Sequence, residues 1–355
     1  MPSVSNRKPA RSWLNAAGLV RISLSAEGSA IAGAVQSSRT SIRSCSLDVR
    51  GIPGRRALVL GGGGAYGIVQ AAYIHAAAEA GFRPDLVIGT SVGALNGAWL
   101  AMHPEDTEGL IQIWRDLGDI RVFDANPVRL AARLVRGPRA LCRNETVARL
   151  LETHLGGVSF ADTRLELAVV ATNLSRGRKQ LFQHGPIAPA ILASTAIPGV
   201  YEPYEIDGEL FVDGCVTASV DLASAVELGA TEVLAIELAP PVMHRPAKTA
   251  LGVLVQSLAV LCHASTDAAE AVASRQAAVR VLRPDLSGLS PWRLESKQGL
   301  IDEYLEIART ELATALDPLG HVIASTTPRP RAVAALPAAR PKLLVRARSW
   351  RKNVA

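Results

Sequence analysis

The chain has 355 residues, of which 48% are hydrophobic and 20% charged, a composition typical of a globular protein and not of a disordered one. It has no run of 18 or more apolar residues, which argues against a membrane-spanning helix. Its net charge is +6, but the positive charge comes from the two ends and hides an acidic middle.

The charges divide the chain into three parts. Residues 1–50 carry seven Lys/Arg and two acids, residues 326–355 carry eight and none, and residues 51–325 therefore have a net charge of −7. We expect a basic, disordered N-terminal extension, one folded domain over 51–325 and a basic, Pro/Arg-rich C-terminal tail. The acidic middle argues against nucleic acid as a partner, whereas the basic ends can be attracted to an anionic membrane.

The N-terminal segment and the cysteines bear on the compartment. The first 50 residues lack the uninterrupted apolar core of a signal peptide, so we expect a cytoplasmic protein with peripheral membrane contact through its basic ends. The cysteines are widely spaced and form no CxxC pair: Cys45, Cys142, Cys215 and Cys262. Free thiols are therefore expected in place of a disulfide scaffold or a zinc site.

Short runs rich in Val, Ile and Leu alternate with helical stretches along the middle of the chain. Strands are predicted at 57–60, 86–89, 165–171, 231–238 and 278–282, and helices at 67–80, 91–102 and 250–264. Asp207-Gly208, between two strand-like halves, predicts a hairpin. The continuous apolar strands favour an α/β fold with a mostly parallel sheet covered on both faces. The Arg-rich stretch 119–143 is expected to form a cap or a surface insertion.

The sharpest local motif is the GxSxG sequence from Gly89 to Gly93, between a predicted strand and a predicted helix. A nucleophile elbow has this order, because its tight turn projects a serine at the N-terminus of the following helix. The motif predicts Ser91 as a nucleophile. Asn96, on the same helix, is interpreted as a packing residue.

A second motif is the glycine run Gly61–Gly64, directly after the first predicted strand. A dinucleotide-binding loop would need an acid about 20 residues on, and the nearest, Asp85, precedes the second strand instead of ending it. Because that strand ends in Ser91, we favour an oxyanion hole built from the glycine amides.

A general base for Ser91 is expected at the end of another strand. Asp213 follows GELFV and precedes Gly214, so a strand delivers it to the edge of the sheet, where a carboxylate can accept the serine proton. The late histidines have no such setting: His244, His263 and His321. Trp114 and Trp292 are most simply packing residues. No HExxH or EF-hand pattern occurs, so no metal is predicted.

Together these motifs resemble the patatin-like phospholipase family. The resemblance rests on GGGxxG at Gly62–Gly67, GxSxG at Gly89–Gly93, and ASTAIPGVYEPYEIDGELFVDG leading to Asp213–Gly214, and it covers about residues 57–310. It implies a three-layer α/β/α fold and a Ser91–Asp213 dyad that hydrolyses lipid acyl esters through an acyl-enzyme, without a histidine or a cofactor. The residues that it places in the site are Ser91 and Asp213 as the dyad, Gly62, Gly63 and Gly64 as the oxyanion hole, and Gly67, Gly89, Gly93 and Gly214 as motif glycines.

Two positions depart from the family pattern. Tyr66 stands in the glycine loop where a basic residue is common, and Cys215 follows Asp-Gly where Gly or Ala is usual. Two alternative functions stay open at this point. One is an acyl-thioesterase or acyltransferase with the same dyad, and the other is a nucleotide-binding or catalytically silent scaffold that uses the glycine loop.

Overall fold

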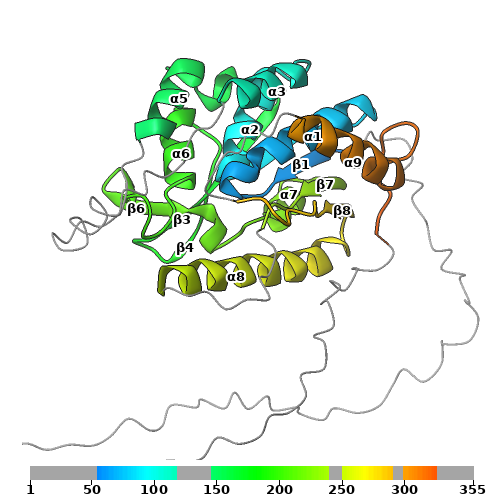
Figure 1. The fold of residues 1–355 in the computed structure, drawn as a ribbon. Helices are drawn as coiled ribbons and strands as arrows, with labels where there is room; N and C mark the ends of the chain where they lie inside the picture. Colours follow the sequence, from blue (N-terminus) through cyan, green and yellow to red (C-terminus); the bar gives the residue numbers. More distant parts are fainter. Residues whose placement is uncertain (1–53, 118–144, 240–249, 291–298, 326–355) are drawn as a thin grey trace, which may run out of the picture. The chain divides into compact units, whose positions relative to one another are not determined.

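The computed structural model describes residues 54–117, 145–239, 250–290 and 299–325 (Figure 1). The predicted basic ends and the predicted insertion at 119–143 lie outside these residues, as do His244 and Trp292. Within the described ranges, no helix combines the length and the apolar character that crossing a membrane requires.

Eight strands form one sheet in the described residues. They are β1 (Arg56–Leu60), β2 (Leu86–Thr90), β3 (Glu166–Asn173), β4 (Arg178–Phe182), β5 (Tyr204–Ile206), β6 (Glu209–Asp213), β7 (Glu232–Ile236) and β8 (Ala278–Leu282). The strands β3, β2, β1, β7 and β8 lie side by side in that order and are parallel. β4 and β6 pair antiparallel with β3, and β5 pairs antiparallel with β6. The predicted mostly parallel α/β sheet is confirmed.

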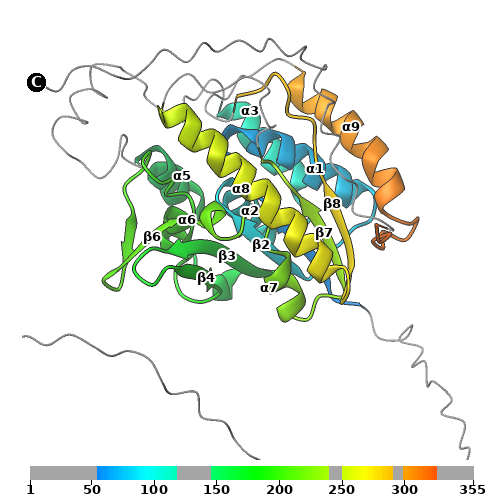
Figure 2. The same ribbon diagram turned by 90° about the horizontal axis from the view of Figure 1, so that it is seen from below.

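Helices cover both faces of this sheet. They are α1 (Gly67–Glu79), α2 (Val92–Met102), α3 (Thr107–Asp116), α5 (Glu145–Leu155), α6 (Ile187–Ser194), α7 (Leu222–Glu227), α8 (Ala250–Ala273) and α9 (Leu300–Ala315). Short 3₁₀ turns occur at Gly64–Tyr66 (η1), Phe160–Asp162 (η2) and Gly214–Val216 (η3). In Figures 1 and 2, α8 spans much of one face, on which α7 also packs, and most other helices lie on the opposite face.

Alternation along the strands explains the three layers. In β1, Leu58 and Leu60 join a core cluster with α1, α2, α3, α5, α6 and α9, whereas Ala57 and Val59 join a second cluster with α7 and α8. Successive side chains of a strand point to opposite faces, so an uninterrupted apolar strand fills two cores at once. The sequence run ALVL therefore needs helices on both faces.

The pairing of β3 places the ends of two other strands together. β4 occupies one edge of β3 over Val169–Asn173, so β2 and β6 must share the other edge. On that edge Thr90, the last residue of β2, pairs with Val170, and Asp213, the last residue of β6, pairs with Ala171. Because β6 runs antiparallel, the carboxyl ends of the two strands meet head to head.

The predicted hairpin is confirmed between β5 and β6. Its two turn residues, Asp207 and Gly208, have φ values of 51° and 79°. A two-residue turn with positive φ at both positions matches the twist of the flanking strands, which explains the Asp-Gly sequence. The hairpin fixes the register in which β6 carries Asp213 to the edge of β3.

Candidate active site

Ser91 connects β2 to α2 through a strained turn. Its φ of 54° and ψ of −121° lie outside the regions that a side-chain-bearing residue ordinarily adopts. Backbone strain of this kind persists only where the surroundings enforce it, and it is concentrated at functional sites. The side chain is 5% exposed and stands at the N-terminus of α2, where the helix dipole favours negative charge.

The two glycines that flank Ser91 are required by close backbone packing. A Cβ at Gly89 would lie within 3.0 Å of the backbone of Gly93 and Ala94. A Cβ at Gly93 would lie equally close to the backbone of Leu60 and Gly61. The motif glycines therefore let α2 begin directly against the ends of β1 and β2, which holds Ser91 at the edge of the sheet.

Asp213 and Ser91 are in direct contact. Ser91 Oγ donates a hydrogen bond of 2.6 Å to Asp213 Oδ2, while Cys215 N donates to Asp213 Oδ1 at 2.8 Å. Asp213 is only 3% exposed, and this burial raises the pKa of its carboxyl, while the hydrogen bonds from Ser91 and Cys215 partly oppose the rise. A buried carboxylate beside a serine hydroxyl is chemically suited to accept its proton.

The glycine loop lies beside this pair. A Cβ at Gly62 would meet Cys215 Sγ within 3.0 Å and Ser91 Cβ at 3.0 Å, so the loop backbone runs past the serine. The Gly62 amide donates a long hydrogen bond of 3.4 Å to Ser219 O. The Gly63 and Gly64 amides have no hydrogen-bond acceptor among the described residues. The loop thus passes Ser91 at Gly62 and has unpaired N–H groups at the two residues that follow.

Sequence reasoning missed a buried polar network that holds the two ends of this loop. Gln70 Nε2 donates to Gly61 O at 3.1 Å, and Asn96 Nδ2 donates to Gly67 O at 3.1 Å and to Gln70 Oε1 at 3.0 Å. Trp114 Nε1 donates to Asn96 Oδ1 at 2.9 Å. Gln70 and Asn96 are 0% and 1% exposed, so α1, α2 and α3 together fix the loop. The interpretation of Asn96 as a packing residue captures only part of this role.

Ser194, at the end of α6, is a second residue that the sequence did not reveal. Its Oγ accepts a hydrogen bond of 2.8 Å from Ser91 N and donates one of 2.6 Å to Val170 O. The hydroxyl thus ties the strained amide of Ser91 to β3. Ser194 lies in the segment ASTAIPGVYEPYEIDGELFVDG, but its role could not be read from the sequence because both of its partners, Ser91 and Val170, come from other elements.

Replacing Ser194 by Ala is expected to lower the free energy of unfolding by about 1–3 kcal/mol, since the Ser91 amide and the Val170 carbonyl would both lose a buried partner. Equilibrium denaturation in urea measures this loss. The matched control is Ser257→Ala on the exposed face of α8, where we expect a change within about 0.5 kcal/mol. Equal stability of the two variants would contradict the proposed bridge.

Comparison with known proteins assigns part of the chain to a family. A sequence model of the family described as patatin-like phospholipase matches residues 58–226, which contain the glycine loop, Ser91 and Asp213. Residues 58–226 belong to the patatin-like phospholipase family. The three-layer fold predicted from the resemblance is confirmed.

Several relatives match about half of this chain. Uncharacterized NTE family proteins of Mycobacterium bovis and Mycobacterium tuberculosis are 31% identical over 195 residues, which are 54% of this chain and 52% of theirs. Lysophospholipase NTE1 of Phaeosphaeria nodorum is 28% identical over 181 residues, which are 51% of this chain and 12% of that protein. The chain thus matches about half the length of the mycobacterial relatives and a small part of the fungal one.

The chain also has a neighbour among solved structures. The crystal structure of VipD from Legionella pneumophila gives a TM-score of 0.41 at 13% identity, over 73% of this chain and 66% of that one.

Of the two departures from the patatin-like pattern, Tyr66 is buried and Cys215 is partly buried. Tyr66 donates its hydroxyl hydrogen to Leu289 O at 3.3 Å, and burial raises the pKa of this phenol to about 12, so the side chain is neutral. The Cys262 thiol on α8 contacts Cys215 O at 3.6 Å. A hydrogen bond with Cys262 and burial raise the pKa of the Cys215 thiol, so Cys215 is a packed thiol beside Asp213.

The other candidates from the sequence, Asp85, His263 and His321, have polar partners of their own. Asp85 accepts from Arg56 N at 2.8 Å, at the amino end of β1 and thus at the edge opposite the glycine loop. His321 lies 2.9 Å from Glu232 at that same edge, and His263 Nδ1 lies 3.0 Å from Glu237 Oε1. Among the described residues, no group of three His, Cys, Asp or Glu side chains is arranged to hold a metal ion.

Proposed function

We propose that the protein hydrolyses carboxylic esters of lipids with Ser91 as nucleophile and Asp213 as general base. The observation that carries this proposal is the 2.6 Å hydrogen bond between Ser91 Oγ and the buried Asp213 Oδ2. Membership of the patatin-like phospholipase family supports a lipid substrate. A relative named as a lysophospholipase supports an ester of a phospholipid or lysophospholipid.

The proposed reaction has two steps. Asp213 takes the proton of Ser91 as Oγ attacks the ester carbonyl, and the alcohol leaves with that proton. Water then attacks the acyl-enzyme with Asp213 again as base, which releases the fatty acid and restores Ser91. Both steps use groups of the chain alone, so no cofactor is assigned.

The glycine loop is the proposed oxyanion hole. The Gly63 and Gly64 amides have no partner in the described structure, so both can donate to the developing oxyanion, whereas the Gly62 amide must first give up its long bond to Ser219 O. One such donor contributes about 3–4 kcal/mol of barrier stabilisation in acyl transfer. The network of Gln70, Asn96 and Trp114 holds the loop in place for this role.

Labelling with a fluorophosphonate serine-hydrolase probe tests the nucleophile. We expect stoichiometric labelling of Ser91 in the wild type and none in Ser91→Ala, because only an activated hydroxyl attacks the phosphorus. The control is Ser257→Ala, which should label like the wild type. A folded wild type that does not label, with and without detergent micelles, would overturn the proposal.

Substrate panels separate the proposed function from the two alternatives. Hydrolysis of phospholipid or lysophospholipid in preference to acyl-CoA supports it, whereas faster acyl-CoA turnover, or acyl transfer to an added alcohol, identifies a thioesterase or acyltransferase. Nucleotide binding that Gly63→Ala abolishes, without labelling of Ser91, would identify a binding protein.

A further inference from the structure

Two cysteines from distant parts of the chain meet beside the proposed base. Cys215 lies in the η3 turn, two residues after Asp213, and Cys262 lies in the middle of α8. Cys262 Sγ is 3.6 Å from Cys215 O, and the two thiols are hydrogen-bonded to each other. Both thiols are free, so a bond between them would join α8 to the turn that follows the base.

Cys215 has contacts with both parts of the site. Its N–H donates a hydrogen bond of 2.8 Å to Asp213 Oδ1. Its thiol packs against the glycine loop, because a Cβ at Gly62 would lie within 3.0 Å of Cys215 Sγ and at 3.0 Å from Ser91 Cβ. A displacement of Cys215 therefore changes the hydrogen bond that orients the carboxylate and the packing at the loop.

The helix α8 is fixed to the sheet by buried charges. His263 Nδ1 lies 3.0 Å from Glu237 Oε1, and Arg283 Nε donates to Glu237 Oε2 at 2.8 Å. Arg283 also donates to Glu270 Oε2 at 2.7 Å. Glu237 directly follows β7 and Arg283 directly follows β8, so these contacts hold α8 at the carboxyl ends of two strands. The helix therefore resists a shift as a whole.

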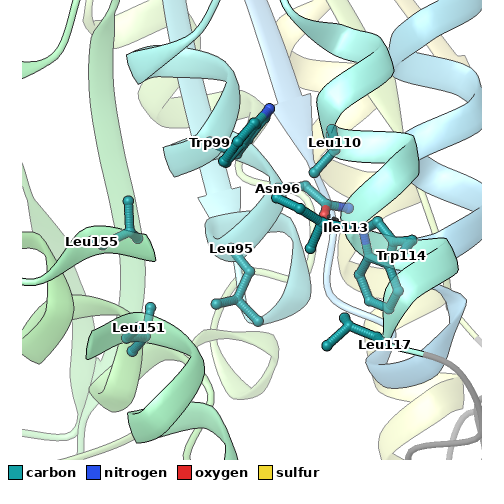
Figure 3. Close-up of a pocket in the computed structure, with 9 residues that line it drawn as sticks. All are labelled: Leu95, Asn96, Trp99, Leu110, Ile113, Trp114, Leu117, Leu151 and Leu155. Atoms are coloured by element: carbon teal, nitrogen blue, oxygen red, sulfur yellow. Dashed lines mark hydrogen bonds between the residues drawn. The ribbon is translucent and has the colours of Figure 1, made fainter. Parts of the chain in front are cut away.

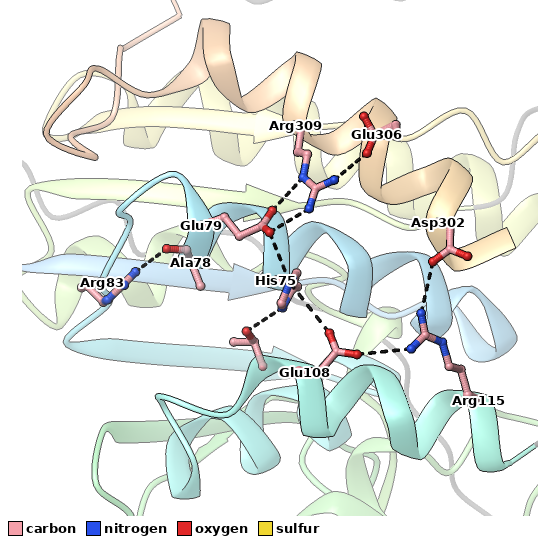
Figure 4. A network of polar contacts seen from close by, with 10 residues as sticks. His75, Ala78, Glu79, Arg83, Glu108, Arg115, Asp302, Glu306 and Arg309 are labelled. Carbon is pink, nitrogen blue, oxygen red and sulfur yellow. Dashed lines mark hydrogen bonds and ion pairs between the residues drawn. The ribbon is translucent and has the colours of Figure 1, made fainter. Parts of the chain in front are cut away.

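The helical layer on the opposite face is fixed as well. Figure 3 shows apolar side chains of α2, α3 and α5 around a cavity of only about 60 Å³. In Figure 4, Arg309 of α9 binds Glu79 of α1 at 2.7 Å, and Arg115 of α3 binds Asp302 of α9 at 3.1 Å. The glycine loop and Ser91 directly precede α1 and α2, so this layer holds them in place.

We propose that Cys215 and Cys262 form a reversible disulfide when the protein meets a hydroperoxide, and that this bond lowers the activity of the site. The disulfide itself does not depend on the proposed function, whereas its effect on Ser91 rests on that function. Two sulfur atoms in hydrogen-bond contact must approach to about 2 Å to form the bond. Because the loop and α8 are both fixed, η3 takes up this movement. A displacement of a catalytic group by about 1 Å can lower the rate about 10²-fold.

The proposed oxidation consumes two thiols and one hydroperoxide. The Cys262 thiolate attacks the O–O bond, which breaks to leave a sulfenic acid on Cys262. The departing alkoxide takes up the proton that the thiol released and leaves as an alcohol, or as water when the oxidant is hydrogen peroxide. The Cys215 thiol then attacks the sulfenic sulfur, the S–O bond breaks, and water leaves with the thiol proton.

The surroundings of the two thiols favour this order and this oxidant. The hydrogen bond from the Cys215 thiol lowers the pKa of the Cys262 thiol, so Cys262 ionises first. Cys262 is only 5% exposed and Cys215 is partly exposed, which favours a small hydroperoxide over a protein oxidant.

Peptide mapping tests the disulfide without any need for turnover. The full chain treated with hydrogen peroxide should give a cross-linked Cys215–Cys262 peptide that is lighter by two hydrogen atoms and disappears after dithiothreitol. The double variant Cys45→Ser/Cys142→Ser should give the same peptide, because it keeps both thiols of the pair. Sulfinic acid at either cysteine of the pair without a cross-link, or two thiols that stay reduced, would overturn the disulfide.

Fluorophosphonate labelling tests the effect on the site. Peroxide should slow the labelling of Ser91 in the wild type by at least about tenfold, and dithiothreitol should restore it. Cys262→Ala should label like the wild type before peroxide and be insensitive to it, because Cys215 then has no partner. Cys215→Ala should likewise be insensitive to peroxide.

The two measurements separate this inference from the proposed function. A cross-linked wild type that labels as fast as the reduced protein would overturn the effect on the site, as would equal slowing of Cys262→Ala by peroxide. A reduced wild type that does not label, but gives the cross-linked peptide, would overturn the proposed function and support the disulfide.

Discussion

Asp213→Asn should lower turnover by at least two orders of magnitude and leave the protein at least as stable as the wild type at neutral pH. The amide cannot accept the Ser91 proton, so kcat should fall about 10²–10⁴-fold, the usual contribution of a general base. Asn is nearly the same size, and its oxygen can still accept from Cys215 N while its NH₂ donates to Ser91 Oγ. The position of Ser91 should thus survive while its activation is lost. Steady-state turnover of a soluble ester, together with thermal denaturation, measures both effects.

The pKa of Asp213 determines the pH dependence of this result. Burial raises the pKa of the folded carboxyl, so the folded state holds its proton more tightly than the unfolded chain does. The carboxyl therefore stabilises the fold fully below the unfolded pKa of about 3.9, and this stabilisation is lost as pH rises through the folded value. Asn does not ionise, so its stability advantage should be largest at neutral pH and vanish in acid.

Activity should follow the same ionisation in the opposite direction. The base must be deprotonated, so kcat/KM should rise with pH along an acid limb whose midpoint lies above the ordinary aspartate pKa. The control is Asp162→Asn, which should keep full activity. Asp162 is an exposed carboxylate that caps a short helical turn and accepts a hydrogen bond from Ser159 N. An Asp213→Asn variant that stays folded and retains more than about a tenth of wild-type kcat would contradict the assignment of the base.

Gly93→Ala is expected to cause a large loss of stability. The new Cβ would lie within 3.0 Å of the Leu60 carbonyl and close to Gly61 O. Both are backbone atoms, one in the last residue of β1 and one in the residue after it, and cannot rotate away, so α2 must move from the sheet. Inserted methyl groups in tight cores cost about 1–3 kcal/mol, and here we expect a loss at or above the upper end because the obstacle is backbone. Probe labelling of Ser91 should fall with it, since the elbow moves as well.

Gly97→Ala on the same helix is the matched control for this prediction. A Cβ at Gly97 meets only side chains, of which Val87 Cγ1 at 3.0 Å is the nearest. Replacing a helical glycine with alanine favours the helix by about 1 kcal/mol, which offsets the small adjustment of Val87. Urea denaturation should therefore show that the free energy of unfolding falls much more in Gly93→Ala than in Gly97→Ala, where it can even rise. Equal losses would show that α2 resists any added methyl group, and that Gly93 has no special role.

The local elements were predictable because their signals are short-range. The strand 86–90, the turn at Ser91 and the helix to Met102 follow one another within 17 residues, and each has its own pattern. The run AVRVL is strand β8 with the bounds that the sequence predicted. In contrast, β4 has the sequence RKQLF with mixed polarity, because it pairs along one edge of β3 and none of its residues is fully buried. Such a strand has no strong sequence pattern.

The sequence alone determined which residues are chemically capable: a serine in a glycine-flanked turn, an aspartate at a strand end and a glycine run after a strand. Only the tertiary structure decided that β2 and β6 share one edge of β3, which brings Ser91 and Asp213 to 2.6 Å across 122 residues of chain. The same holds for Ser194 and Asn96, whose partners come from other elements. The reason is physical: turns and strands arise from neighbouring residues, whereas strand order and register depend on which distant surfaces pack together.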